Sequence, residues 1–336
     1  MNPRVTVLYV HPGGNGWYQI QSMAHLLAAT FEAPLWQLVD PGHVSLVKRL
    51  AGELPRRRAR GGSHAIVIVP NPAQLVHIAS WRHWFPGFAS VRAWVIDSFW
   101  DERIPRMARR HNHLDKVWIT DGELVESWEG VTGTPVGYLP WGTDVLGLGP
   151  VAGERPVDLQ RVGRQPASWD DDTSVGALAA ERGVVFRGRP AFGGSMAANQ
   201  ASVFGALAAA KYVLAFSNRH SPADYTHPTR EYLTGRWLDA LAAGACVAGL
   251  PPETVASRQL LWGEGLLSVP ADDASSGLDI VADAVRAWTP DMALHNRALA
   301  RRRLDWRWRF SVLADEIGWR PARLDDDLAA LARVVE

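Results

Sequence analysis

Two carboxylates and a set of phosphate-binding groups fall within one short stretch of the chain. In the segment EYLTGRWLDALAAGACVAG, which begins at residue 231, Glu231 and Asp239 are separated by seven residues, and Arg236 lies between them. Carboxylates accept hydrogen bonds from the hydroxyls of a sugar or a ribose, whereas a guanidinium binds phosphate oxygens through its planar fork. The spacing therefore suits a ligand that carries both hydroxyls and phosphate.

The same segment predicts a helix that opens at Thr234 and Gly235, because Leu238, Leu241 and Ala242 follow at helical spacing. A helix N-terminus offers unsatisfied N–H groups and a partial positive charge, which suits a diphosphate. A capped amphipathic helix with an acidic first turn explains the same residues at least as well when only the spacing is considered.

A second candidate is the glycine-rich loop HPGGNGW, residues 11–17, which follows an apolar run. Gly13 and Gly14 would let the backbone approach a ligand closely, beside His11. The glycines do not follow the G-x-G-x-x-G dinucleotide pattern, and no Walker A motif is present. A plain tight turn is an equally good interpretation of this loop.

The elements that must position these residues alternate between short apolar runs and helical stretches, which predicts parallel sheets covered by helices. The predicted strands are 5–10, 65–69, 93–96, 116–119 and 136–139 in the first half, and 159–163, 184–187, 212–216, 246–250 and 266–269 in the second. A Gly- and Pro-rich stretch, 142–156, is expected to link the halves. The tail from residue 294 is helical in pattern and strongly charged.

Ligands of open α/β sheets bind beyond the carboxyl ends of the strands. The residues at those ends are therefore the ones to inspect. In the second half they are Arg164, 188–189, 217–220 and Pro251; in the first half they are 11–16, Asn71, 97–98, 120–121 and 141–144. Asp97 and Asp121 are the acidic candidates in the first half, although a strand-end cap explains them more simply.

The composition is that of an ordinary globular protein: 336 residues, 47% hydrophobic and 21% charged, with 35 basic and 35 acidic residues. Because the charges balance, no net electrostatic field draws the chain to nucleic acid or to acidic membranes, although Arg56, Arg57, Arg58 and Arg60 mark a local basic patch. The single Cys246 forbids an internal disulfide. No apolar run is long enough to span a membrane, and the N-terminus lacks the features of a signal peptide. A cytoplasmic protein is expected.

The segment from Glu231 to Gly249 resembles the E-x7-E signature of retaining GT-B glycosyltransferases of the family 4 type, with Asp239 in place of the second glutamate. It is also similar to the R-x-[FW]-[ED]-x-L-A-x-G pattern of spore-maturation-type glycosyltransferases, except that Leu238 occupies the aromatic position. Four further segments match in order: His11–Gly16, LPWGTD (139–144), VGR (162–164) and LDWRWRF (304–310). The lysine that usually follows the G-R arginine is missing.

This resemblance implies an α/β protein of GT-B architecture, with two Rossmann-like domains facing across a cleft. The implied domains are 1–150 on the acceptor side, 151–310 on the donor side, and a C-terminal helix, 311–336, that returns to the first domain. It implies sugar transfer from a nucleoside-diphosphate sugar to a small-molecule, lipid or glycan acceptor, with retention and with neither metal nor cofactor.

The resemblance also assigns roles to the candidate residues. Glu231 would hold the hydroxyls of the donor sugar and Asp239 the ribose. Arg236, Arg164 and the amides of Thr234 and Gly235 would stabilise the departing diphosphate, and Gly13 and Gly14 would also contact the donor. His11, Asp97 and Asp121 would lie on the acceptor side. The histidine expected in the first domain is His11, His77, His111 or His113, each of which has a structural explanation as well.

Two other functions stay open. An epimerase or hydrolase of the same fold would turn over the donor without an acceptor, and a non-catalytic protein would bind sugar nucleotide without turnover. A D-x-D metal site at Asp170–Asp172 is less favoured than a solvated loop, because isolated acidic runs are usually surface features.

Overall fold

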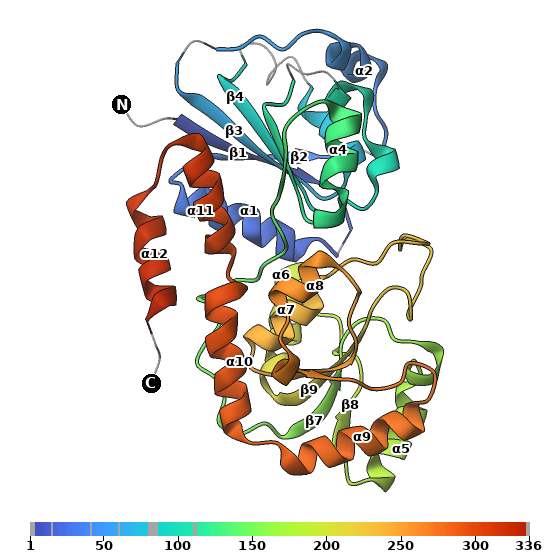
Figure 1. Ribbon diagram of the computed structural model, residues 1–336. Helices are drawn as coiled ribbons and strands as arrows, with labels where there is room; N and C mark the ends of the chain where they lie inside the picture. Colours follow the sequence, from blue (N-terminus) through green and yellow to red (C-terminus); the bar gives the residue numbers. More distant parts are fainter. Residues whose placement is uncertain are drawn as a thin grey trace. The chain divides into compact units, whose positions relative to one another are not determined.

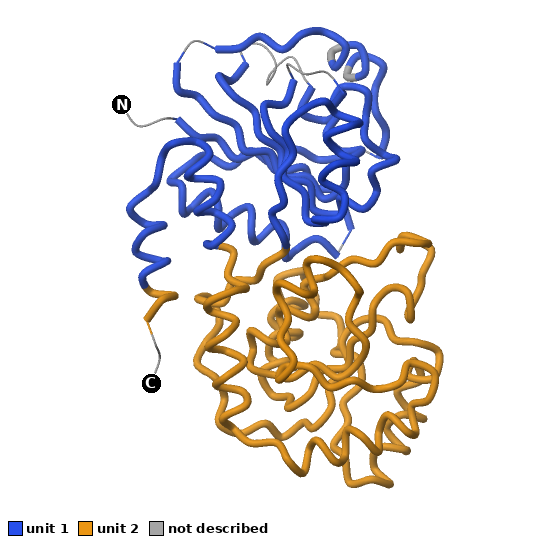
Figure 2. The backbone as a smooth tube through the Cα atoms, viewed as in Figure 1, with its two compact units in different colours: residues 1–140, 307–329 blue, residues 141–306, 330–336 orange. Residues whose placement is uncertain are grey.

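The computed structural model describes residues 4–14, 16–40, 42–59, 61–79, 87–109 and 113–333. The chain forms two compact units, coloured separately in Figure 2. The first comprises Met1–Pro140 and Arg307–Ala329, and the second comprises Trp141–Trp306 and Ala330–Glu336. The first unit is therefore built from two pieces of chain that are distant in sequence.

The first unit is a six-stranded parallel sheet with strand order β2-β1-β3-β4-β5-β6. Its strands are β1 (Arg4–His11), β2 (Leu35–Val39), β3 (Ser63–Val69), β4 (Ser90–Val95), β5 (Lys116–Ile119) and β6 (Val136–Tyr138). Helices α1 (Tyr18–Thr30), α2 (Leu46–Glu53) and α4 (Val125–Thr132) accompany them (Figure 1). The apolar run 65–69 is buried throughout, as expected for a parallel strand covered on both faces.

The chain returns to the first unit through α11 (Trp306–Ile317) and α12 (Ala322–Ala332). Glu316 accepts from Lys116 Nζ at 3.3 Å, and the Trp319 ring packs edge-on against Phe31 with centroids 5.7 Å apart. The return is made by two helices because Gly318, with φ +73°, follows the end of α11. The C-terminal helical segment thus crosses back to the first domain, as the sequence predicts.

The second unit is a five-stranded parallel sheet with strand order β11-β10-β9-β7-β8. Its strands are β7 (Val157–Arg161), β8 (Phe186–Arg187), β9 (Ala210–Phe216), β10 (Cys246–Leu250) and β11 (Leu266–Leu267). Its helices are α5 (Asp172–Glu181), α6 (Met196–Ala208), α7 (Gly235–Ala242), α8 (Val255–Leu260), α9 (Ala274–Ala287) and α10 (Pro290–Arg303).

All ten predicted strands are present, with ends that differ by a few residues. The sequence missed β2, an edge strand that pairs only with β1 and whose residues are half-buried or exposed. Such a strand lacks the continuous apolar run by which the buried strands were recognised.

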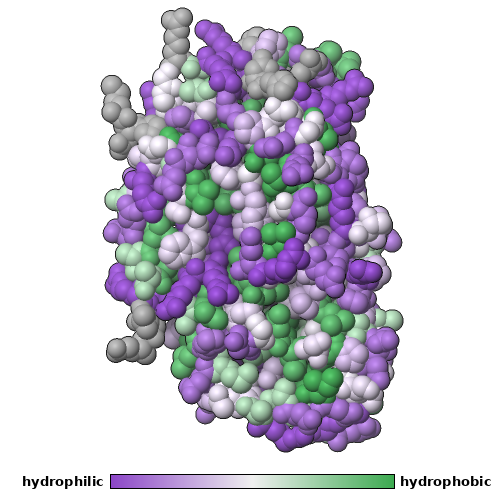
Figure 3. All heavy atoms as spheres, in the orientation of Figure 1, coloured by the Kyte–Doolittle hydropathy of each residue, from purple (hydrophilic) through white to green (hydrophobic). Residues whose placement is uncertain are grey.

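The surface carries polar residues over much of the face drawn in Figure 3, with apolar residues between them. None of the helices in the described part of the chain combines the length and the apolar character needed to cross a bilayer.

Candidate functional site

Helix α7 begins at Gly235, and its N-terminal end has no side-chain cap. Thr234 is the N-cap residue, yet its hydroxyl makes no capping bond and is buried without a hydrogen-bond partner among the described residues. The first N–H groups of a helix have no partner within the helix. A buried hydroxyl without a partner costs about 1–3 kcal/mol, so this helix end is suited to receive an acceptor group from a ligand.

Two arginine side chains, those of Arg189 and Arg236, converge on the loop Val162–Arg164, which follows β7 and contributes Arg164. Arg236 donates from Nη1 to the carbonyl oxygen of Arg164 at 2.9 Å, and Arg189 donates from Nη2 to the carbonyl oxygen of Gly163 at 3.0 Å. Gly163 has φ +74°, and a Cβ there would lie 2.9 Å from Nη1 of Arg236. Glycine at this position therefore permits both the backbone turn and the close approach of the guanidinium.

The positive charge of this arginine cluster, Arg164, Arg189 and Arg236, is not compensated by acidic side chains. Within the part of the chain that the structure describes, no ion pair joins any of the three to a carboxylate. The Arg164 guanidinium lies over the ring of Tyr225 at 4.6 Å, and its Nη1 is buried without a partner in the same described region. A bound anion would supply the missing partner.

Burial lowers the pKa of Arg236 to about 10, and the positive charge of Arg164 is the next largest cause. The group is still charged at neutral pH. Because desolvation and like charges both disfavour the charged form, a phosphate placed among these arginines would be bound strongly.

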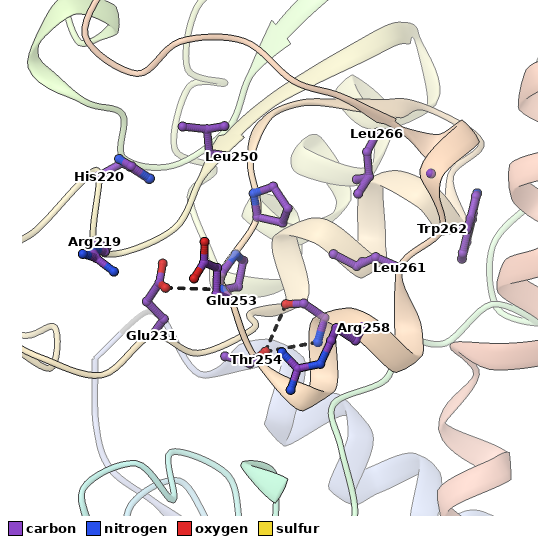
Figure 4. A pocket seen from close by; sticks show the side chains of 14 residues that line it. Arg219, His220, Glu231, Leu250, Glu253, Thr254, Arg258, Leu261, Trp262 and Leu266 are labelled. Atoms are coloured by element: carbon purple, nitrogen blue, oxygen red, sulfur yellow. Dashed lines mark hydrogen bonds between the residues drawn. The ribbon is translucent and has the colours of Figure 1, made fainter. Parts of the chain in front are cut away.

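Glu231 lines a cavity of about 770 Å³ in the second unit (Figure 4). One carboxylate oxygen accepts from Ser217 Oγ at 2.5 Å, and the other accepts from the backbone N–H of Glu253 at 3.3 Å. The remaining lone pairs are available to a ligand. The cavity is also lined by two arginines, a histidine and four apolar side chains, namely Arg219, Arg258, His220, Leu250, Leu261, Trp262 and Leu266.

The loop that carries Glu231 is fixed by two neighbouring side chains. Asn218 donates from Nδ2 to the carbonyl oxygen of Arg230 at 2.8 Å, and Nδ1 of His227 accepts from the backbone N–H of Arg230 at 3.0 Å. Asn218 is 7% exposed, so its contact with Arg230 is shielded from water. Glu231 is therefore held through its own carboxylate and through the backbone of the preceding residue, Arg230.

Asp239 lies on α7, one turn beyond Arg236, and is 5% exposed. It is not among the residues that line the Glu231 cavity. The structure thus places Arg164 and Arg236 together beside the open end of α7 and places Glu231 at a cavity. The ribose contact of Asp239 stays a prediction.

In the first unit, the loop after β1 has the backbone that the glycines predict. Gly13 and Gly14 have φ +77° and +74°, and nothing lies within 4 Å of the space that a side chain would occupy at either position. His11 Nδ1 accepts from the backbone N–H of Gly13 at 2.9 Å, so its Nε2 carries the proton when the ring is neutral. Asn15 lies outside the described residues.

Asp97 and Asp121 follow the neighbouring strands β4 and β5. Asp121 is buried and accepts from Ser98 Oγ at 2.6 Å. Burial raises the pKa of Asp97 well above its usual range, and the negative charge of Asp121 raises it further. Asp97 is thus a carboxyl group that retains a proton to higher pH than an exposed one.

This shift predicts a pH-dependent effect of the substitution Asp97→Asn. The native state binds the proton more tightly than the unfolded state, so the free energy of unfolding falls as pH rises from the ordinary carboxyl range through the raised pKa. The variant carries no charge to desolvate. We expect its melting temperature to exceed that of the wild type at about pH 8 and the difference to shrink toward about pH 4.

Melting curves across this pH range provide the measurement. Asp326→Asn, at an exposed aspartate of α12, is the control and should shift little at any pH. A difference between Asp97→Asn and the wild type that does not vary with pH would contradict the expectation.

The other candidates from the sequence have structural partners. The guanidinium of Arg161 pairs with Asp170 and with Asp172, whose side chains stay 59% and 40% exposed, so these carboxylates are solvated surface groups with an arginine partner. His77 Nε2 lies 3.1 Å from Asp40 Oδ1, and His113 lies between the carbonyl oxygens of Met107 and Leu54. His111 lies outside the described residues.

Sequence reasoning did not single out Tyr225, Glu253 or Arg258. Arg189 and Ser217 were flagged only as strand-end residues. Arg189 contacts the loop of the arginine cluster, and Ser217 contacts the Glu231 carboxylate. Their location at the carboxyl ends of β8 and β9 was the sequence feature that could have identified them.

Two Rossmann-like α/β units, each with a parallel sheet, define the GT-B fold class. No family model and no curated protein matches the sequence. Among solved structures, the chain is similar to a glycosyltransferase from Rickettsia africae ESF-5, with 9% identity, a TM-score of 0.52, and coverage of 94% of this chain and 98% of that one.

It is also similar to the apo form of the lipopolysaccharide outer core galactosyltransferase WaaB, with 10% identity, a TM-score of 0.50, and coverage of 93% of this chain and 99% of that one. At these identities the likeness establishes the fold alone. The GT-B fold predicted from the sequence is confirmed.

Proposed function

We propose that the chain is a glycosyltransferase that moves a sugar from a nucleoside-diphosphate sugar to an acceptor hydroxyl. The observation that carries the proposal is the arginine cluster beside the uncapped end of α7, which has positive charge and hydrogen-bond donors without an acidic partner among the described residues. This arrangement matches a diphosphate, and the fold is one that glycosyltransferases have.

The proposed reaction breaks the bond between the anomeric carbon and the diphosphate oxygen and forms a bond from that carbon to the acceptor oxygen. The nucleoside diphosphate departs with the bonding electron pair, and its leaving oxygen takes up the proton that the acceptor hydroxyl loses. Arg164, Arg236 and the amides at the start of α7 neutralise the charge that develops on the leaving group. Because these groups supply positive charge, the proposal needs no metal ion. Retention at the anomeric carbon is proposed on the sequence resemblance.

Glu231 is proposed to bind hydroxyls of the donor sugar. Its carboxylate is held by Ser217 and by the amide of Glu253, so it is oriented before the ligand arrives. Preorientation of this kind lowers the cost of reaching the transition state. Gly13 and Gly14 in the first unit are proposed to contact the donor, and His11, Asp97 and Asp121 are proposed to contact the acceptor.

The proposal predicts that one class of nucleoside diphosphate stabilises the protein against heat. A ligand that binds only the folded state adds about 2.7 kcal/mol of stability at a concentration of about 100 times its Kd. The measurement is a thermal-shift panel of UDP, GDP, dTDP and ADP, each compared with its nucleoside. We expect a shift with one diphosphate and a much smaller shift with its nucleoside.

No shift with any diphosphate would overturn the proposal. Turnover of the matching sugar nucleotide in the absence of any acceptor would instead favour an epimerase or hydrolase. Binding without turnover in the presence of a broad acceptor panel would favour a non-catalytic binding protein.

A further inference from the structure

Residues 46–58, LVKRLAGELPRRR, form a segment that the proposed function does not use. The segment contains five cationic residues and one acidic residue, together with four large apolar ones. It belongs to the first unit, whereas the arginine cluster and the Glu231 cavity belong to the second. An inference about this segment is therefore independent of the proposed function.

Helix α2 turns its apolar residues toward solvent. Leu46, Val47 and Leu50 are 70%, 75% and 58% exposed, and Leu54, directly after the helix, is 51% exposed. Leu46, Leu50 and Leu54 recur every four residues and so share one face. Figure 1 shows α2 on the outside of its unit.

The side of α2 that contacts the rest of the unit is marked by Gly52. A Cβ added there would lie 3.0 Å from the Cβ of Met107 and 3.7 Å from that of Ala79. The helix therefore packs inward with a residue that has no side chain and exposes its leucines. A helix of a globular protein normally does the reverse, because burial of apolar side chains is what attaches it to the core.

Exposed cations accompany these apolar residues. Arg49 and Arg57 lie within the segment, and Arg106 and Arg109 lie in the turn Arg106–Arg109. Within the described ranges, no ion pair joins any of these four to a carboxylate. Arg56 and Arg58 differ, because both pair with Asp115, at 2.9 and 2.8 Å; of the two, Arg56 is buried. The basic run in the sequence thus divides into a structural arginine and exposed ones.

A hollow of about 610 Å³ lies between α2 and the turn Arg106–Arg109, and both apolar residues and arginines line it. Arg49 and Leu50 of α2 line it together with Arg103 and Arg106, and Met107 and Val76 form part of its apolar lining. Glu53 is its one acidic lining residue. The hollow therefore offers arginine donors at the edge of an apolar floor, which suits a phosphate-bearing amphiphile.

We propose that this α2 surface, formed by Leu46, Val47, Leu50, Leu54, Arg49 and Arg106, binds the face of an anionic lipid bilayer. The leucines and the valine enter the boundary between headgroups and acyl chains, and the arginines bind lipid phosphates. A second copy of the chain is a poorer occupant of this surface. A symmetric dimer would bring the same exposed arginines together, and like charges repel.

Cosedimentation with vesicles tests the proposal. The wild-type chain is mixed with phosphatidylcholine vesicles and with vesicles in which part of the phosphatidylcholine is replaced by phosphatidylglycerol. We expect binding to the second kind, and weaker binding as salt is added. Leu46→Ser with Leu50→Ser should lower the partition coefficient at least about tenfold. Arg49→Gln and Arg106→Gln should each lower it about fivefold.

The control variants remove equivalent groups elsewhere. Leu294→Ser replaces a leucine of α10 that is 55% exposed, and Arg187→Gln with Arg302→Gln removes two exposed arginines of the second unit. These variants should bind vesicles as the wild type does. Melting curves of each variant confirm that it is folded.

Three outcomes would overturn the proposal: wild-type chain that stays in solution with anionic vesicles, equal binding to both kinds of vesicle, or equal losses in the test and control variants. A concentration-dependent dimer in sedimentation velocity that the double serine variant abolishes, without vesicle binding, would assign the surface to a second copy instead.

Discussion

Replacing Glu231 by alanine is expected to lower kcat for sugar transfer by roughly 100-fold or more. The carboxylate lines the cavity with one oxygen on Ser217 Oγ and the other on the amide of Glu253, so the substitution removes an oriented acceptor of sugar hydroxyls. Nucleoside diphosphate affinity should change little, because the arginine cluster is intact in this variant. Steady-state kinetics with the donor identified by thermal shift, and titration of the nucleotide, provide the two measurements.

A matched control is available in the same cavity. Glu253 is exposed and lines the cavity, and its contact with Glu231 comes from its backbone N–H. Glu253→Ala keeps that N–H and should retain kcat within a few-fold. Wild-type kcat in a folded Glu231→Ala protein would remove Glu231 from the reaction.

Replacing Arg236 by alanine is expected to lower kcat/KM by roughly 100-fold or more, because a donor to the leaving diphosphate is lost. Unlike the glutamate variant, it should also weaken binding of the nucleoside diphosphate. The affinity of the corresponding nucleoside should be preserved, since no phosphate is then present for the arginine to bind. Calorimetric titration of the diphosphate and of the nucleoside separates these effects.

Arg236 also donates to the backbone of the loop after β7, so its loss affects that loop as well. Arg164→Ala distinguishes the two roles, because the described contact of the Arg164 side chain is with the ring of Tyr225. It should weaken diphosphate binding at least about tenfold, since a hydrogen bond to a charged group contributes about 1.5–3 kcal/mol. Arg187→Ala, at an exposed residue of β8, is the control. Equal diphosphate affinity in Arg164→Ala, Arg236→Ala and the control would exclude the cluster as the phosphate site.

The part of the site that depends on local sequence was predictable. The start of α7 follows from the leucine spacing after Gly235. Arg236 lies in the first turn of that helix, and this does not depend on how the helix packs in the fold. The glycine-rich loop after β1 is of the same kind, because positive φ at Gly13 and Gly14 is a local property of the backbone.

The part that depends on distant contacts was not predictable in the same way. Asp170 and Asp172 are solvent-exposed, as the sequence predicts, but the sequence does not predict that Arg161 pairs with both from the preceding strand. Spacing indicates no such pairing, because the side chains meet only after the chain has turned. Tyr225 belongs to a loop whose path is set by hydrogen bonds between side chains and backbone, such as those of Asn218 and Thr226. A periodic pattern of apolar residues does not predict such bonds.

The basic run near residue 56 shows a third situation. Its composition indicates a surface patch, yet Arg56 is buried against Asp115 and the carbonyl oxygen of Phe88. Burial at one position in such a run is decided by which residue faces the sheet, and that depends on β4 and β5. The exposure of the α2 leucines was also not predictable from the sequence. Amphipathic spacing defines an apolar face but does not determine whether that face is turned toward the core or toward solvent.

The two-piece construction of the first unit has a consequence for how the protein folds as it is made. Residues 307–329, which complete that unit, emerge from the ribosome only after the whole of residues 141–306. At about 5–20 residues per second, the delay is on the order of ten to thirty seconds. During that time Phe31 lacks the Trp319 ring that packs against it, and Arg92 and Lys116 lack Glu316. The nascent first unit must therefore remain unfinished, and exposed to chaperones, while the second unit is synthesised.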